Sequence, residues 1–264
     1  MKKRIFITGA SSGIGRATAE LLVRQGHEVW GTSRDPARLP VDARFHPIAL
    51  DLADSKSARE SFQRALAEAG HFDVVINNAG SGHFDPGSTI TEEIVREQFQ
   101  VLVFAQIEIF QAALAAMRER GRGLIINVTS MAARLPVPYM SAYNAAKAAM
   151  ASFTMTVQLE LRASSIRVVD VQPADICTSF NEAVVQPATT DRALAQVWKQ
   201  IDANLQAAPP PTLVARRLSL LIAQKNPPAR VTVGGLFQAG VAPFIFRLLP
   251  QGVRVWGLKR YYRL

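Results

Sequence analysis

The chain reads Thr8-Gly9-Ala10-Ser11-Ser12-Gly13-Ile14-Gly15 at its first turn, and this segment guides the interpretation of the remainder. A short β-branched run, residues 4–8, precedes it and predicts a strand, and an apolar-periodic run after it predicts a helix ending at Gly26. Glycines at such a turn let the backbone approach a pyrophosphate, while the helix N-terminus offers free N–H groups. We therefore predict nucleotide binding here. A glycine cluster that only ends a strand is the alternative.

Strands and helices alternate along the chain. Further strands are predicted at 29–33, 45–50, 74–76, 124–128, 168–171 and 230–233. Further helices are predicted at 55–69, 92–120, 139–163 and, capped by Thr212 as the last helix, 212–224. Nearly continuous apolar strands between helices predict a parallel sheet covered on both faces. The expected fold is α/β, a Rossmann-like doubly wound sheet of about seven strands in three αβα layers.

The length of 264 residues suits one domain, and we assign residues 1–264 to a single Rossmann-like domain. Residues 174–211 have weak periodicity and end in Pro209-Pro210-Pro211, which favours an excursion beside the ligand crevice over a domain linker. Residues 236–264 form an apolar and basic C-terminal extension.

Composition narrows the class of protein. A hydrophobic content of 48% and a charged content of 19% are typical of a globular chain. A single cysteine, Cys177, excludes an internal disulfide and a Cys-rich zinc site, and no metal site is predicted. The apolar run Ile5–Ile7 is too short for a signal peptide, and no run reaches the roughly 18 apolar residues of a membrane span. We expect a cytoplasmic protein.

The net charge of +9 lies entirely in the last quarter of the chain. Residues 203–264 contain nine Lys and Arg and no Asp or Glu. Such asymmetry favours an anionic partner. A solvated basic surface that only aids solubility is the alternative. Nucleic acid is not predicted, because no recognisable reading module accompanies the charge.

Several segments together resemble the short-chain dehydrogenase/reductase family. The TGxxxGxG spacing at residues 8–15 matches its cofactor turn, and Asn77-Asn78-Ala79-Gly80 matches its NNAG segment. Ser130 precedes Tyr143 by thirteen residues, and Tyr143 with Lys147 forms the family's YxxxK element. Pro173 to Thr178 resembles its PGxxxT segment. The resemblance covers about residues 3–235.

The resemblance implies a reaction centre. Tyr143 and Lys147 are one helical turn apart and share a helix face. An ordinary tyrosine pKa is about 10, and an adjacent ammonium favours the phenolate. By this resemblance, Tyr143 transfers the proton. Lys147 lowers the pKa of Tyr143 and contacts the nicotinamide ribose, and Ser130 hydrogen-bonds the substrate oxygen. Without the other motifs, the same residues are equally consistent with an ordinary surface Tyr–Lys pair and a serine that forms a turn.

The cofactor is predicted to be NADP(H). The second strand ends in Ser33-Arg34, where an NAD-selecting site carries an acid, and a guanidinium suits a 2′-phosphate. An Arg34–Asp35 surface pair is the alternative. By resemblance, Asp51 and Leu52 contact the adenine. Further cofactor contacts are implied for Asn78, Ala79, Gly80, Pro173, Ile176 and Thr178.

The sequence departs from the family at three places. Leu102 stands where many members have an asparagine that organises a water relay to the lysine. Ala105 and Ala174 stand where glycines are usual. The chemistry remains possible, but the proton relay must be rerouted or absent.

The expected substrate is a lipophilic carbonyl or alcohol, acted on by a homodimer or homotetramer. The apolar residues that suggest it also suit an ordinary core: Met131, Leu135, Met140, Phe180, Val184, Val185 and Trp198. The rivals are a nucleotide-binding sensor without turnover and a reductase of small polar carbonyls. The tail carries Trp256, Tyr261 and Tyr262 among basic residues, which suits peripheral contact with the inner face of a membrane or packing on a partner subunit.

Overall fold

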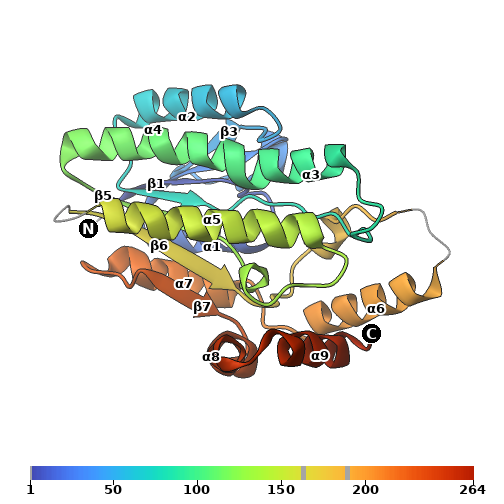
Figure 1. The fold of residues 1–264 in the computed structure, drawn as a ribbon. Coiled ribbons are helices and arrows are strands. Elements are labelled where there is room, and N and C mark those ends of the chain that lie inside the picture. The colour runs from blue at the N-terminus through green and yellow to red at the C-terminus, as the bar shows by residue number, and fades with distance from the viewer. Residues whose placement is uncertain (1, 162–164, 188–190) are drawn as a thin grey trace.

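The computed structural model describes residues 2–161, 165–187 and 191–264 and contains a parallel sheet of seven strands (Figure 1). The strand order is β3-β2-β1-β4-β5-β6-β7, which confirms the doubly wound sheet. The strands are β1 Arg4–Ile7, β2 Glu28–Ser33, β3 Phe45–Ala49, β4 Val74–Asn77, β5 Arg122–Val128, β6 Ser165–Pro173 and β7 Arg230–Val233. The order reverses between β1 and β4, and the ligand crevice of such sheets lies at that point.

Helices cover both faces of the sheet (Figure 1). One layer consists of α1 Gly13–Arg24 and α7 Thr212–Ala223, and the other of α2 Ser55–Ala69, α4 Ala105–Arg120 and α5 Ser141–Glu160. The bounds of α2 match the prediction because Asp54 caps its first turn and Gly70, with φ +72°, ends it. The helix expected at 139–163 is observed as α5, which begins at Ser141 and ends at Glu160; residues 162–163 of the expected range lie outside the described residues.

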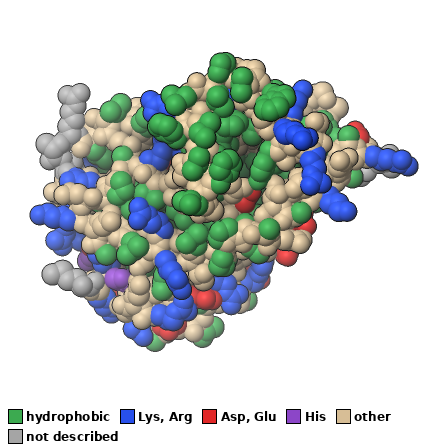
Figure 2. Space-filling model, turned by 90° about the horizontal axis from the view of Figure 1, so that it is seen from below, with side chains coloured by type: hydrophobic (Ala, Val, Ile, Leu, Met, Phe, Trp, Pro, Cys, Tyr) green, Lys and Arg blue, Asp and Glu red, His purple; other side chains and the backbone are tan. Residues whose placement is uncertain are grey.

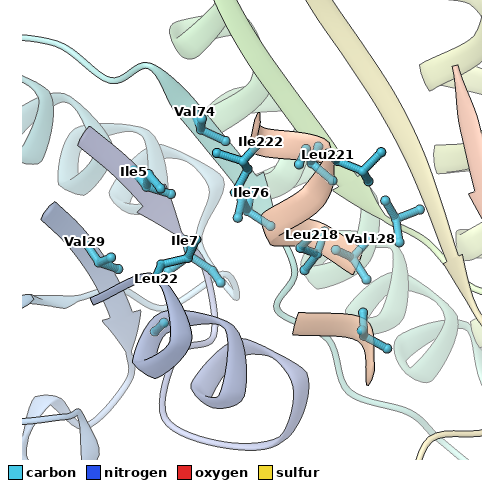
Figure 3. Packing of buried hydrophobic residues seen from close by; sticks show 14 of the residues in the cluster. Ile5, Ile7, Leu22, Val29, Val74, Ile76, Val128, Leu218, Leu221 and Ile222 are labelled. Carbon is cyan, nitrogen blue, oxygen red and sulfur yellow. The ribbon is translucent and has the colours of Figure 1, made fainter. Parts of the chain in front are cut away.

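Alternate strand residues supply two cores, one on each face of the sheet. Ile5 and Ile7 face the α1–α7 layer with Ile76 and Leu218 (Figure 3). Phe6 points the other way and meets Phe62 edge-to-face at 4.9 Å. Burial of each such side chain contributes roughly 1.5–3 kcal/mol. These cores fix the strand ends that carry the ligand crevice.

The segment 174–211 contains a helix that the sequence analysis did not predict, α6 Arg192–Gln206. The Asp191 side chain caps it by accepting from Ala193 N at 2.8 Å. Leu194 and Val197 are buried on one face, at helical spacing, so the expectation of weak periodicity was wrong. Residues 188–190 of the same segment lie outside the described residues.

The C-terminal extension is also helical. After the π-helix η5 Phe237–Val241 come α8 Ala242–Leu248 and α9 Gln251–Tyr262, so α7 is not the last helix (Figure 1). Thr212 is the first residue of α7, and Pro211 holds the cap position, which corrects the predicted cap. Apolar side chains on several faces of α8 and α9 hide the helical period.

The predicted helix 92–120 is interrupted. α3 Glu92–Phe99 passes into the π-helix η2 Gln100–Phe104 before α4. By length and composition alone, the whole tract 92–120 could cross a membrane. The sequence analysis expected no segment of this kind. It packs on the sheet, and 44% of its most apolar window is buried. Such a core helix is weak evidence for a membrane span.

Candidate active site

A large cavity of about 1750 Å³ opens at the carboxyl ends of the strands. Every residue that the sequence analysis assigned to catalysis or to cofactor binding lines it. The set comprises Gly9, Ser11, Ser12, Gly13, Ile14, Gly15, Arg34, Asp51, Leu52, Asn78, Ala79, Gly80, Ser130, Tyr143, Lys147, Pro173, Ile176 and Thr178. Parallel strands bring these distant segments to one edge of the sheet.

The glycine turn after β1 is tightly packed. Gly9 and Gly13 have φ of +71° and +52°, the left-handed region that glycine favours. A Cβ on Gly15 would lie 1.9 Å from Gly9 O, and one on Gly9 would lie 2.9 Å from Ala79 Cα. A side chain is therefore excluded at Gly9 and at Gly15. The turn and the start of α1 line the cavity, and the N-terminus of a helix suits a phosphate.

The segment after β4 is bonded to the glycine turn. The N–H groups of Asn78 and Ala79 donate to Thr8 Oγ1 at 2.9 and 3.0 Å. The Asn78 side-chain amide donates to Thr8 O at 2.9 Å and to Gly9 O at 3.3 Å. The two loops on either side of the β1–β4 switch point are thus held as one cradle.

A basic pair stands at the end of β2. Arg34 is exposed and, within the described part of the chain, forms no salt bridge, so the alternative pairing with Asp35 is absent. The Asp35 side chain instead accepts from Ala37 N at 3.0 Å. Arg38, which sequence reasoning missed, also lines the cavity. Two guanidinium groups are therefore available to an anion at this end of the cavity.

Tyr143 and Lys147 lie one turn apart on α5, and Ser130 follows β5 within hydrogen-bonding reach of Tyr143. Lys147 Nζ donates to Val128 O at 3.0 Å and lies 5.8 Å from the centre of the Tyr143 ring. The Ser130 hydroxyl accepts from Ala132 N at 3.0 Å. The three side chains expected at the reaction centre are therefore on the wall of one cavity.

Burial shifts the pKa values of Tyr143 and Lys147. It raises the pKa of Tyr143, and a hydrogen bond with Ser130 opposes the rise only in part. It also lowers the pKa of Lys147 to about 8, against the attraction of Asp170. The expectation that Lys147 lowers the Tyr143 pKa was wrong for this structure: the pKa is raised, and the group that opposes the rise is Ser130. The raised pKa favours the protonated phenol over the phenolate.

Leu102 lies where a polar relay would be expected, and it is fully buried in η2. A Cβ on Gly80 would lie 3.2 Å from Leu102 Cδ2 and 3.7 Å from Lys147 Nζ, so the leucine is close to the lysine. The nearby amide of Gln106 is engaged, because its Nε2 donates to Ala79 O at 2.8 Å. The surroundings of Lys147 on this side are apolar. Ala105 is buried as well.

The substrate end of the cavity has an apolar wall. Most of the apolar side chains proposed for it line it: Met131, Leu135, Met140, Phe180 and Val185. Val184 and Trp198 instead pack in a separate core with Phe84. The C-terminal extension supplies the opposite wall, which sequence reasoning missed: Phe237, Ile245, Phe246, Leu249, Leu258, Tyr261 and Tyr262.

One carboxyl group faces this apolar end. Asp175 lines the cavity, and burial raises its pKa. It accepts from Gln238 Nε2 at 2.7 Å, and the same nitrogen is 2.7 Å from the Tyr261 hydroxyl. The contact ties the loop after β6 to the C-terminal helices. Asp175 lies inside the segment Pro173 to Thr178, but its role was not predicted.

Known proteins share this architecture. A family model described as short chain dehydrogenase matches residues 3–189. 3-Ketodihydrosphingosine reductase of Bacteroides thetaiotaomicron is 33% identical over 98% of each chain. Carbonyl reductase (NADPH) 2 of Sus scrofa is 32% identical over 75% of this chain and 80% of its own.

Solved structures agree with these relatives. A short-chain dehydrogenase from Streptomyces avermitilis superposes with a TM-score of 0.82 at 28% identity, over 99% of this chain and 96% of that one. The match to the family model extends over the glycine turn, the segment after β4 and the Ser130–Tyr143–Lys147 group. The chain belongs to the short-chain dehydrogenase/reductase family and is an oxidoreductase of that type.

Proposed function

We propose that the protein is an NADP(H)-dependent reductase of a carbonyl on a lipophilic molecule. The observation that carries the proposal is the half-buried Tyr143 beside Ser130 and Lys147, in the same cavity as the glycine cradle. A phenol that keeps its proton near pH 7 suits donation to a carbonyl oxygen, which is the reductive direction. The reverse reaction uses the same residue as base.

The cradle fits a dinucleotide. A side chain at Gly9 or Gly15 would clash with the neighbouring backbone, so the turn stays compact, and the start of α1 lines the cavity beside it. Asp51 and Leu52 are available to the adenine, and Arg34 and Arg38 to a 2′-phosphate. A nicotinamide bound there supplies the hydride. The preference for NADP(H) rests on the two arginines. Solved structures of this fold bind NADP+ in one case and NAD in another.

The protein's own groups place the substrate and move the proton. The Ser130 hydroxyl donates a hydrogen bond to the substrate oxygen, and Tyr143 transfers its proton to that oxygen. Lys147 is mostly protonated below its pKa of about 8, so its positive charge stabilises negative charge developing on the phenol oxygen. The apolar wall excludes water and accepts the hydrocarbon part of the substrate. The Bacteroides relative is named as a reductase of a keto compound, 3-ketodihydrosphingosine, and this name supports the proposed substrate class.

Replacement of Tyr143 by phenylalanine tests the mechanism. We expect Tyr143→Phe to abolish NADPH-dependent turnover of alkyl ketones while NADPH affinity, followed by fluorescence, stays within about threefold. Tyr139→Phe is the control. The Tyr139 ring packs against the Phe84 ring, with the ring centres 5.4 Å apart, and it does not line the cavity. More than a tenth of wild-type activity in Tyr143→Phe contradicts the proposal. Tight NADPH binding without turnover on a broad carbonyl panel favours the sensor, and turnover of small polar carbonyls alone favours the second rival.

The assembly and location remain predictions. We propose a homodimer or homotetramer in the cytoplasm, and light scattering of the purified protein with fractionation of cells checks both.

A further inference from the structure

The C-terminal helices carry a concentration of exposed apolar side chains. We call the following set the apolar face: Leu236, Phe237, Val241, Phe244, Ile245, Leu248, Val253, Val255, Trp256 and Tyr261. Scattered exposed apolar residues are ordinary, but a contiguous patch marks a binding surface. The exposed fractions are large: 87% for Leu236, 69% for Phe244, 70% for Leu248 and 68% for Trp256.

The same segment is basic. Its cations are Arg247, Arg254, Lys259, Arg260 and Arg263, and residues 203–264 contain no acidic residue at all. Among the residues that the structure describes, none of these five forms a salt bridge. Four of them are exposed, whereas Arg254 is half-buried and donates to Leu249 O at 2.7 Å. The charge of this surface is therefore left for a partner outside the chain.

The surface surrounds the entrance to the active-site cavity. Ile245 and Tyr261 belong both to the apolar face and to the cavity wall, and Leu258 of α9 lines the cavity between them. Figure 2, which views the molecule from the side of α8 and α9, shows hydrophobic side chains around a hollow, with Lys and Arg side chains at its border. A ligand held against this surface would thus lie at the mouth of the cavity.

The charge of the surface favours an anionic membrane over a second copy of the chain as its partner. A two-fold contact places a patch against its own copy. Here it would set five cations of one chain against five of the other, without a carboxylate from residues 203–264 to separate them. An anionic lipid surface offers the opposite sign of charge and an apolar interior. Trp and Tyr side chains also favour the boundary between lipid headgroups and acyl chains.

The geometry suits attachment rather than insertion. The apolar helix Phe237–Leu248 has 12 residues and is therefore about 18 Å long, shorter than the roughly 30 Å core of a bilayer. It can lie along the surface with its apolar side chains among the acyl chains. We propose that η5, α8 and α9 dock the protein on an anionic membrane and turn the cavity mouth toward the lipid. If the proposed substrate class is right, an apolar substrate then enters without crossing water.

Sedimentation with vesicles tests the docking without any enzyme assay. The full-length protein is mixed with vesicles of phosphatidylglycerol and phosphatidylcholine, or of phosphatidylcholine alone. We expect sedimentation with the anionic vesicles at low salt and release at high salt, because screening shortens the range of the attraction. Each basic residue near such a surface contributes about fivefold in affinity, so Lys259→Gln, Arg260→Gln and Arg263→Gln combined should weaken binding roughly a hundredfold.

A second pair of variants tests the apolar part. Trp256→Ser should weaken vesicle binding at least tenfold, whereas Leu159→Ser, which alters a 68% exposed leucine on α5, should leave it unchanged. Circular dichroism and NADPH binding verify that each variant is folded. Absence of binding at low salt, or equal loss in both serine variants, overturns the proposal. A wild-type dimer that Trp256→Ser dissociates, with no vesicle binding, assigns the surface to a second copy instead.

Discussion

Replacing Lys147 by methionine removes a buried amine while it keeps the length of the side chain. Lys147 is 4% exposed, and burial lowers its pKa from 10.5 to about 8. In the unfolded chain the amine regains its ordinary value of 10.5. Between these two values the unfolded state therefore holds a proton that the folded state has lost. The wild-type fold gains stability as the pH rises through this window, and Lys147→Met lacks that gain.

The pKa values set the size of the effect. One pKa unit corresponds to about 1.4 kcal/mol, so the fall from 10.5 to about 8 corresponds to roughly 3 kcal/mol over the whole window. Between pH 7 and pH 9.5, a range in which the protein can be handled, the expected gain is about 2 kcal/mol. At pH 7 both states are protonated, so the folded state carries the full desolvation cost of the charged amine.

Urea unfolding of the cofactor-free protein at several pH values measures this directly. The quantity of interest is the difference in unfolding free energy between wild type and Lys147→Met, which should move by about 2 kcal/mol in favour of wild type from pH 7 to pH 9.5. Lys56→Met, on the exposed side of α2, is the matched control. A difference that stays constant over this range would refute a buried, cation-bearing Lys147. The variant should also lose turnover at pH 7 while it stays folded.

Three further substitutions probe the remaining parts of the site. Arg34→Ala should weaken NADPH binding roughly ten- to a hundredfold and NADH binding far less, since a charge-assisted contact contributes about 1.5–3 kcal/mol; equal losses in a fluorescence titration would show that Arg34 does not read the phosphate. Gly15→Ala should reduce NADPH affinity at least tenfold, because its Cβ would lie 1.9 Å from Gly9 O, whereas Gly252→Ala meets nothing within 4 Å; equal affinities would contradict the tight cradle. Leu102→Asn should lower the unfolding free energy by about 2–3 kcal/mol, since it puts an amide into an apolar site. The activity of its folded fraction should stay within about tenfold of wild type, and a complete loss would mean that the apolar contact itself is needed.

Local signals explain why most of the fold could be predicted. Strands such as Val74–Asn77 are fully buried and read as continuous apolar runs, and caps at Asp54 and Gly70 fixed the bounds of α2. The spacing of Leu194 and Val197 in α6 was also present but was overlooked. The helices α8 and α9 could not be recognised in the same way, because they are apolar on more than one side.

The candidate site also contains residues that could be predicted from the sequence and residues that could not. Ser130 could be placed because the carboxyl ends of parallel strands meet at one edge of the sheet, and Tyr143 because its spacing to Lys147 matches the family's YxxxK element. Arg38 and Asp175 could not, since their importance depends on contacts between segments far apart in the sequence. The bond between Asp175 and Gln238 spans 63 residues, and no local pattern encodes it. The raised pKa of Tyr143 likewise depends on how deeply the folded chain buries it.

Two parts of the chain contribute to the cavity wall. The family model ends at residue 189, and the proton donor, the lysine and the cofactor cradle all lie before that point. The facing wall comes from α6, α8 and α9, all of which lie after it. Under the proposed function, mutations in residues 191–264 alter part of the substrate wall while they leave the proposed catalytic residues in place. Exchanging this C-terminal part among relatives offers a route to new substrate ranges on an unchanged catalytic half.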